Sequence, residues 1–117
     1  MDRQGLFKYA AMHLKTVPDY PWKKFPNYAI LRHAQNRKWY GLVMDVAADR
    51  LGLKAAQRLD ILNVKVHPEA SYFLQQKSGI FPAYHMNREH WISILLDSDL
   101  SNKEIFSLLN QSFDLTK

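Results

Sequence analysis

The fold class is indicated most clearly by YAILRHAQNRKWYGLVMDVA, residues 28–47. Two apolar segments, 28–34 and 38–47, lie on either side of the polar tripeptide 35–37, and this spacing predicts a β-hairpin with a tight turn. Side chains alternate along the second segment. One face is expected to carry Tyr40, Leu42, Met44 and Val46. The other face is expected to carry Trp39, Gly41, Val43 and Asp45.

Two further segments, 59–66 and 90–97, alternate in the same way and predict strands. Their inward side chains are expected to be Leu62, Val64, Val66, Ile92, Ile94 and Leu96. Residues 80–86 predict a short extended piece. Residues 48–58 fit either a short helix or a long hairpin loop, and Gly52 favours the loop.

Three segments predict amphipathic helices, because apolar residues recur in each at spacings of three and four. They are residues 3–17, residues 67–79 and a segment that begins after Ser101. The expected buried stripes are Leu6, Ala10, Leu14 and Val17 in the first, Ala70, Phe73 and Leu74 in the second, and Ile105, Leu108, Leu109 and Phe113 in the third. Ser101 and Glu104 form a capping box, in which each side chain accepts from a free backbone N–H. Three prolines make residues 18–27 an extended loop.

The elements therefore follow the order helix, three strands, helix, one or two strands, helix. Short connections favour a mostly antiparallel sheet, and the amphipathic helices are expected to cover one face of it. Residues 1–117 contain no repeat and no linker. The sequence thus predicts a single α+β domain.

The net charge of +5 is distributed unevenly. Residues 1–66 hold 12 Lys and Arg against 5 Asp and Glu, whereas residues 67–117 hold 4 against 6. A basic half can attract nucleic acid or an anionic surface, although a solvated surface can be equally basic. No apolar run is long enough to cross a membrane, and the first 17 residues predict no secretory leader. With no cysteine, the chain is expected to be cytoplasmic and without disulfides.

The motifs offer no support for catalysis. No serine lies in G-x-S-x-G or S-x-x-K, and four glycines form no phosphate-binding loop. We expect no enzyme and no cofactor.

His85 and His90 are the candidates for a metal site, but zinc needs three or four ligands and no zinc motif is present. Glu89 or His67 would have to complete the set. The favoured interpretation is structural: the two histidines form a corner of the sheet and fix how Trp91 begins its strand.

Basic and aromatic residues are interleaved in two places, at 22–25 (WKKF) and at 32–40 (RHAQNRKWY). Such a pattern supplies phosphate contacts and stacking partners, or it pins a loop and solvates a turn. The sheet face away from the helices is expected to carry Trp39, Asp45, Asn63, Lys65, Trp91 and Ser93. Two tryptophans on such a face indicate either a covering loop, with the proline segment favoured, or a binding surface.

Several segments resemble the MmcQ/YjbR family of small bacterial proteins. They are PDYPWKKFPNYAILRH, ILNVKVHPE, FPAYHMNREHWISILLD and LLNQSFDL, and the densest match holds His85, Asn87, His90 and Trp91. The resemblance implies the order α-β-β-β-α-β-β-α, like that of type III secretion chaperones, and a non-enzymatic DNA-binding role through a double wing of β-hairpins. Residues 48–58 are longer and more basic than the family pattern, which leaves the second wing's shape open.

We therefore expect weak, salt-dependent DNA binding. The expected contacts are Lys23, Lys24, Arg32, Arg37, Lys38, Trp39, Arg50, Lys54, Arg58 and Arg88. The alternative is a protein-interaction adaptor that binds a peptide or a second copy through the aromatic sheet face, as a monomer or weak dimer. A third hypothesis is a metal or small-ligand site at His85 and His90, with Asn87 and Arg88 on its rim.

Overall fold

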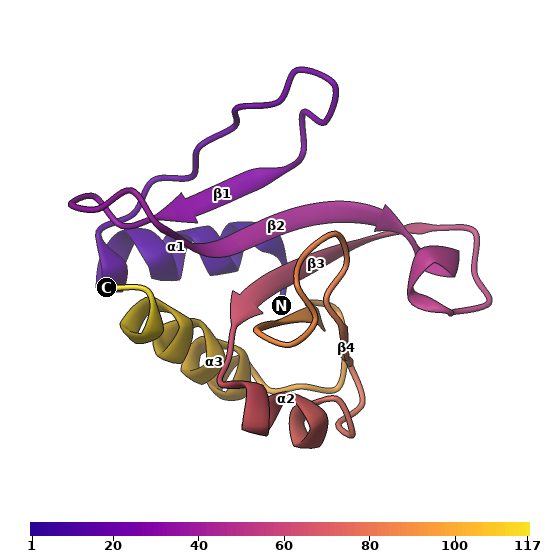
Figure 1. The fold of residues 1–117 in the computed structure, drawn as a ribbon. Helices are drawn as coiled ribbons and strands as arrows, with labels where there is room; N and C mark the ends of the chain where they lie inside the picture. The colour runs from indigo at the N-terminus through magenta and orange to yellow at the C-terminus, as the bar shows by residue number, and fades with distance from the viewer.

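The computed structural model describes all of residues 1–117, and its element order confirms the α-β-β-β-α-β-β-α prediction (Figure 1). The elements are α1 (Arg3–Leu14), β1 (Ala29–Arg32), β2 (Trp39–Ala47), the 3-10 turn η1 (Ala48–Leu51), β3 (Arg58–Lys65), α2 (Pro68–Leu74), β4 (Ile80–Pro82), β5 (Trp91–Leu95) and α3 (Asn102–Leu115). The five strands form one sheet in the order β1-β2-β3-β5-β4, and every neighbouring pair is antiparallel.

The helices cover one face of this sheet, as predicted (Figure 1). Leu6 and Ala10 of α1 and Ile105 of α3 are fully buried against Val43 and Leu62 of the central strands. Removing each large side chain from water contributes roughly 1.5–3 kcal/mol. This layer, one helix pair on one sheet face, is the main core of the domain.

Helix α3 begins and packs as its sequence predicts. Ser101 and Glu104 make both bonds of the capping box. On its buried side, the Ser112 hydroxyl donates to the Tyr40 carbonyl oxygen at 2.6 Å and accepts from the backbone N–H of Lys65 at 2.8 Å. These two bonds fix the helix against β2 and β3.

A β-bulge in β2 leaves Tyr40 on the helix side, as predicted, and changes the facing of the residues that follow it. Leu31 pairs with Gly41 while Arg32 pairs with Trp39, so Tyr40 is the extra residue between them. Its side chain turns toward the helices, where the hydroxyl donates to Thr16 at 2.5 Å and burial raises its pKa to about 12.

After the bulge the side chains alternate again, but each lies on the face of the sheet opposite to the one expected. Leu42, Met44 and Val46 lie on the face away from the helices. Asp45 lies on the same side as Val43, the side of the helices, so the prediction that Asp45 faces away from the helices is wrong as well.

Two helix ends also differ from the sequence prediction. Helix α1 ends at Leu14, because Lys15 adopts a left-handed backbone (φ 53) and the N–H of Thr16 closes on the Ala10 carbonyl. Val17, predicted to be buried, is 83% exposed. Helix α2 is only seven residues long, so it presents a narrow face to the core, and Phe73 is 72% exposed instead of buried. None of the helices is both long and apolar enough to cross a bilayer.

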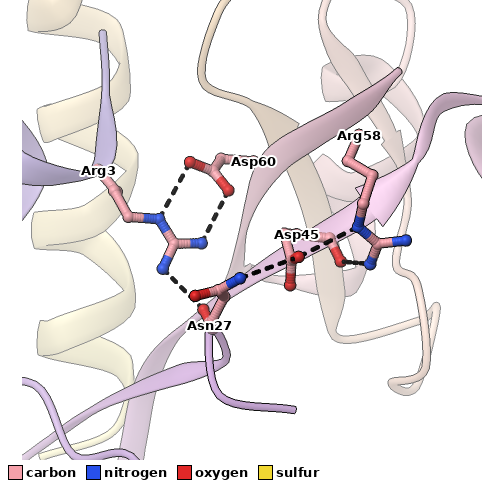
Figure 2. A network of polar contacts seen from close by, with 5 residues as sticks. All are labelled: Arg3, Asn27, Asp45, Arg58 and Asp60. Carbon is pink, nitrogen blue, oxygen red and sulfur yellow. Dashed lines mark hydrogen bonds and ion pairs between the residues drawn. The ribbon is translucent and has the colours of Figure 1, made fainter. Parts of the chain in front are cut away.

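A network of charged side chains connects the start of α1 to the end of β2 and the start of β3 (Figure 2). Asp45 and Asp60 are directly opposite each other on β2 and β3. Arg3 donates to both oxygens of Asp60, at 3.0 and 2.7 Å, and to the carbonyl oxygen of Asn27 at 2.7 Å. Arg58 pairs with Asp45 at 3.1 Å. Two like charges that face each other across strands are thus each neutralised by an arginine.

Candidate functional site

The face of the sheet opposite the helices carries a second apolar cluster. Its buried residues are Ile30, Leu42, Met44, Val46 and Ile61. No α-helix covers this cluster. Two loops and Leu51 of η1 pack around it instead, the loops being the proline-rich loop before β1 and the loop between β4 and β5.

Between these loops lies a hollow of about 470 Å³, within the usual range of roughly 300–1,000 Å³ for ligand sites. We call it the aromatic groove. It is lined by Trp22, Phe25, Tyr28, Trp39, Leu42, Met44, His85, Met86, Asn87 and Trp91. All three tryptophans of the chain are in this lining, and no carboxylate is.

The proline-rich loop builds one wall of the groove. Its start is fixed by two backbone hydrogen bonds between Asp19 and Ile30, at 3.0 and 2.8 Å. Trp22 then contacts Trp39 edge to face, with ring centroids 5.8 Å apart, and Phe25 stacks on Tyr28 at 4.7 Å. The proline-rich loop therefore packs over part of the aromatic face and leaves the groove open beside it, so both alternatives left by the sequence apply in part.

Tyr28 remains a neutral phenol at neutral pH. Burial is the main cause that raises its pKa, and the Asp45 carboxylate raises it further while Arg58 opposes this effect. The aromatic wall therefore carries no negative charge.

The loop between β4 and β5 builds the other wall, and it is anchored by buried polar groups. Asn63 donates to the carbonyl oxygen of Tyr84 at 2.9 Å and accepts from the hydroxyl of Ser93. Ser93 in turn accepts from the backbone N–H of Tyr84 at 2.9 Å. Asn63 and Ser93 are fully buried, so this closed set of bonds fixes Tyr84 to the sheet.

The histidine segment turns a corner before β5, but Asn87 rather than either histidine side chain makes the bonds that hold it. The Asn87 side-chain oxygen accepts from the backbone N–H groups of Glu89 and His90, and the Asn87 carbonyl accepts from the N–H of Trp91. His85 adopts a left-handed backbone (φ 62). This turn directs His85 and Asn87 into the lining of the groove and starts the strand at Trp91.

Nowhere in the chain do three or more His, Asp or Glu side chains come together in a way that would hold a metal ion. The residues present therefore do not form the three-ligand set that the metal hypothesis needs at His85 and His90.

One arginine is held directly over the aromatic wall. The guanidinium carbon of Arg32 lies 5.6 Å from the Trp39 ring centroid, a cation–π distance. Its Nε also donates to Asp19 at 3.0 Å. Arg32 is thus held beside Trp39 in the wall of the groove, and Asp19 partly compensates its positive charge.

Other cations follow lining residues along the chain. Lys23 and Lys24 lie between Trp22 and Phe25, and they are exposed and outside the ion pairs of the structure. The same holds for three further predicted contacts, Arg37, Lys38 and Arg88. Lys38 precedes Trp39, and Arg88 follows Asn87.

The remaining predicted contacts lie elsewhere. Arg50 and Lys54 belong to η1 and the loop after it, at the end of β2 opposite Trp39 (Figure 1). Eight residues of strand separate these ends, roughly 26 Å at about 3.3 Å per residue. Arg58 is held by Asp45 (Figure 2). The predicted set therefore splits into a group around the groove and a smaller group at the far end of the hairpin.

Sequence reasoning missed the groove's floor, Leu42 and Met44. Both were expected to share a face with Tyr40, and the bulge separates them from it. Gly41 is the signal that could have revealed this, because glycine within a strand often marks a bulge. Here a Cβ at Gly41 would lie 3.1 Å from Leu31.

The fold and groove define a class of small α+β proteins in which helices cover one face of an antiparallel sheet and loops frame an aromatic hollow on the other. The chain matches the model of the YjbR family over residues 14–115 and belongs to this family. The predicted resemblance is confirmed.

The chain is also similar to several proteins in sequence and in structure. The chain is 50% identical to YyaQ of Bacillus subtilis (strain 168) over 117 residues, covering 100% of this chain and 99% of YyaQ. It is 31% identical to YjbR of Escherichia coli (strain K12) over 62 residues, 52% of each chain. A crystal structure of a Pseudomonas syringae protein superposes with a TM-score of 0.98 at 50% identity and full coverage of both chains. Protein DR2400 of Deinococcus radiodurans, at 23% identity and a TM-score of 0.63 over 86% of this chain and 67% of its own, shares the fold.

Proposed function

We propose that this protein is a non-enzymatic DNA-binding module that holds the phosphate backbone with the cations around the aromatic groove. The observation that carries the proposal is their arrangement: Lys23, Lys24, Lys38 and Arg88 flank a lining without carboxylates and are outside the ion pairs of the structure. Unpaired cations of this kind release counterions from DNA when they bind.

The expected binding is weak and strongly dependent on salt. Four phosphate contacts give a slope of about −3.6 in log affinity against log salt, so affinity should fall roughly 100-fold between about 50 and 200 mM salt. Little sequence preference is expected, because lysine contacts to phosphate carry no base information.

The test is fluorescence anisotropy of a labelled duplex titrated at both salt concentrations. Lys23→Glu/Lys24→Glu should abolish measurable binding at the higher salt. The matched control, Lys8→Glu/Lys103→Glu, makes the same change in net charge on exposed positions of α1 and α3 and should bind like the wild type. Equal losses in both variants, or no binding even at low salt, would refute the proposal.

A second candidate, a protein-interaction adaptor, is favoured by the apolar character of the same groove. Phe25 is 48% exposed at its edge, which suits a peptide side chain or a second copy of the chain. Sedimentation of wild type and Phe25→Glu tests the second-copy form: a dimer that dissociates in the variant supports it, and a monomer at all concentrations contradicts it.

A further inference from the structure

We infer that the aromatic groove binds an unpaired nucleobase, so that the protein prefers single-stranded to double-stranded nucleic acid. This inference rests on the proposed function and deepens it, since it names the form of nucleic acid that the groove accepts. Backbone contacts alone would favour the duplex, because its phosphate charges are more densely spaced than those of a single strand.

The first argument is the shape and chemistry of the groove. Leu42 and Met44 form an apolar floor, and tryptophan rings form the sides. Flat aromatic surfaces stack on any base, and single-strand binding proteins use such surfaces together with a cationic groove. In a duplex the faces of the bases are covered by their neighbours, so only an unpaired base can place its face against Trp22 or Trp39.

The second argument is the position of the charges. Lys23 and Lys24 lie in the chain directly between Trp22 and Phe25, two residues of the aromatic lining. Arg32 lies over the Trp39 ring. A single strand alternates base and phosphate, so a base in the groove brings its own phosphates to these cations. An uncharged apolar ligand would leave Lys23 and Lys24, which make no ion pair in the structure, without a partner.

The third argument is a polar side chain in the lining of the groove. Asn87 lines it, and its side-chain oxygen is already engaged by two backbone N–H groups. Its amide nitrogen donates to no acceptor within the protein, and because Asn87 is exposed it can exchange a water partner for a ligand. A carbonyl oxygen on a base edge, such as those of thymine or uracil, is a suitable acceptor. A stacking wall and one donor fit a base better than they fit an aliphatic side chain.

The test uses intrinsic tryptophan fluorescence, because Trp22, Trp39 and Trp91 are the only tryptophans and all line the groove. Three ligands of equal length, about ten nucleotides, are titrated: a thymidine single strand, the same strand without bases, and a duplex. The single strand should quench the fluorescence and bind about 5- to 150-fold more tightly than the abasic strand for each stacked base. The abasic strand should bind by charge alone and leave the emission unchanged.

A pair of aromatic variants tests the position of the base. Phe25→Ala should weaken the single strand about fivefold or more and leave the duplex affinity unchanged. Tyr72→Ala is the matched control, since Tyr72 is also an exposed aromatic residue (70% exposed) but lies on α2. Thermal unfolding of each variant verifies that its fold is retained.

The outcomes separate this inference from the proposed function. Equal binding of single, abasic and double strands without quenching refutes the base site and leaves backbone binding intact. Quenching by poly-glutamate as strong as by the oligonucleotide refutes it in favour of an acidic peptide. Failure to bind any of these polyanions refutes both proposals.

Discussion

Replacing Arg3 by methionine should destabilise the domain through the carboxylates that this arginine neutralises. Arg3 makes two bonds to Asp60 and one to the carbonyl of Asn27 (Figure 2). Methionine keeps the apolar stem of the side chain and removes the guanidinium. Asp60 would then lie opposite Asp45 with no cation of its own.

The size of the effect follows from the geometry. Bonds to charged groups contribute about 1.5–3 kcal/mol, and partial exposure of Asp60 (34%) places the pair in the lower part of this range. With the added repulsion across the strands, the loss should be about 2 kcal/mol. The entropy of unfolding is roughly 2.1 cal/mol/K per residue, so this loss of stability lowers Tm by about 8 °C.

A second substitution identifies the cause. Asp60→Asn in the Arg3→Met background removes the unpaired charge, so the double variant should regain about half of the lost stability in urea unfolding at low salt. High salt should reduce the cost of Arg3→Met, because salt screens the repulsion. If the double variant is no more stable than Arg3→Met, the repulsion between the two aspartates is not what Arg3 relieves.

Three further predictions concern single positions. Gly79→Ala should lower the free energy of unfolding in urea by about 2 kcal/mol or more, because φ is +91 and a Cβ would lie 2.7 Å from a serine oxygen. Gly52→Ala should lower it by only about 1 kcal/mol, because φ is +79 but a Cβ there would meet open space. Equal losses would contradict this explanation. Burial lowers the pKa of His33 in the folded state, so the unfolded state binds more protons as the pH falls. The free energy of unfolding should therefore decrease as pH drops below about 6.5, by at most about 1.4 kcal/mol per pH unit, until the lowered pKa is reached. Unfolding between pH 7.5 and 5.5 should show this slope in the wild type and lose it in His33→Gln. Asn63→Ala should speed hydrogen exchange at the Tyr84 amide, because it breaks the bonds that hold the loop between β4 and β5. Unchanged exchange would show that the loop is held otherwise.

The sequence by itself determined the elements whose causes are local. The capping box at Ser101, the alternation that buries Ile92 and Ile94, and the polar turn between the first two strands all act within a few residues. The order of helices and strands and the antiparallel pairing followed from these local patterns and short connections.

Tertiary structure alone decided which way several side chains point. One extra residue at Tyr40 reverses the facing of Leu42 and Met44, and a single left-handed residue at Lys15 ends α1 and leaves Val17 in solvent. Such effects depend on register and on contacts with distant segments, which periodicity cannot report.

The aromatic groove belongs to the same category. Its walls come from segments about sixty residues apart, the loop that carries Trp22 and the loop that carries Asn87. The sequence predicted that tryptophans share the open face of the sheet. Where the loops pack and which hollow they leave was set by the bonds of Asp19 to β1 and of Asn63 to Tyr84, because only folding brings these partners together.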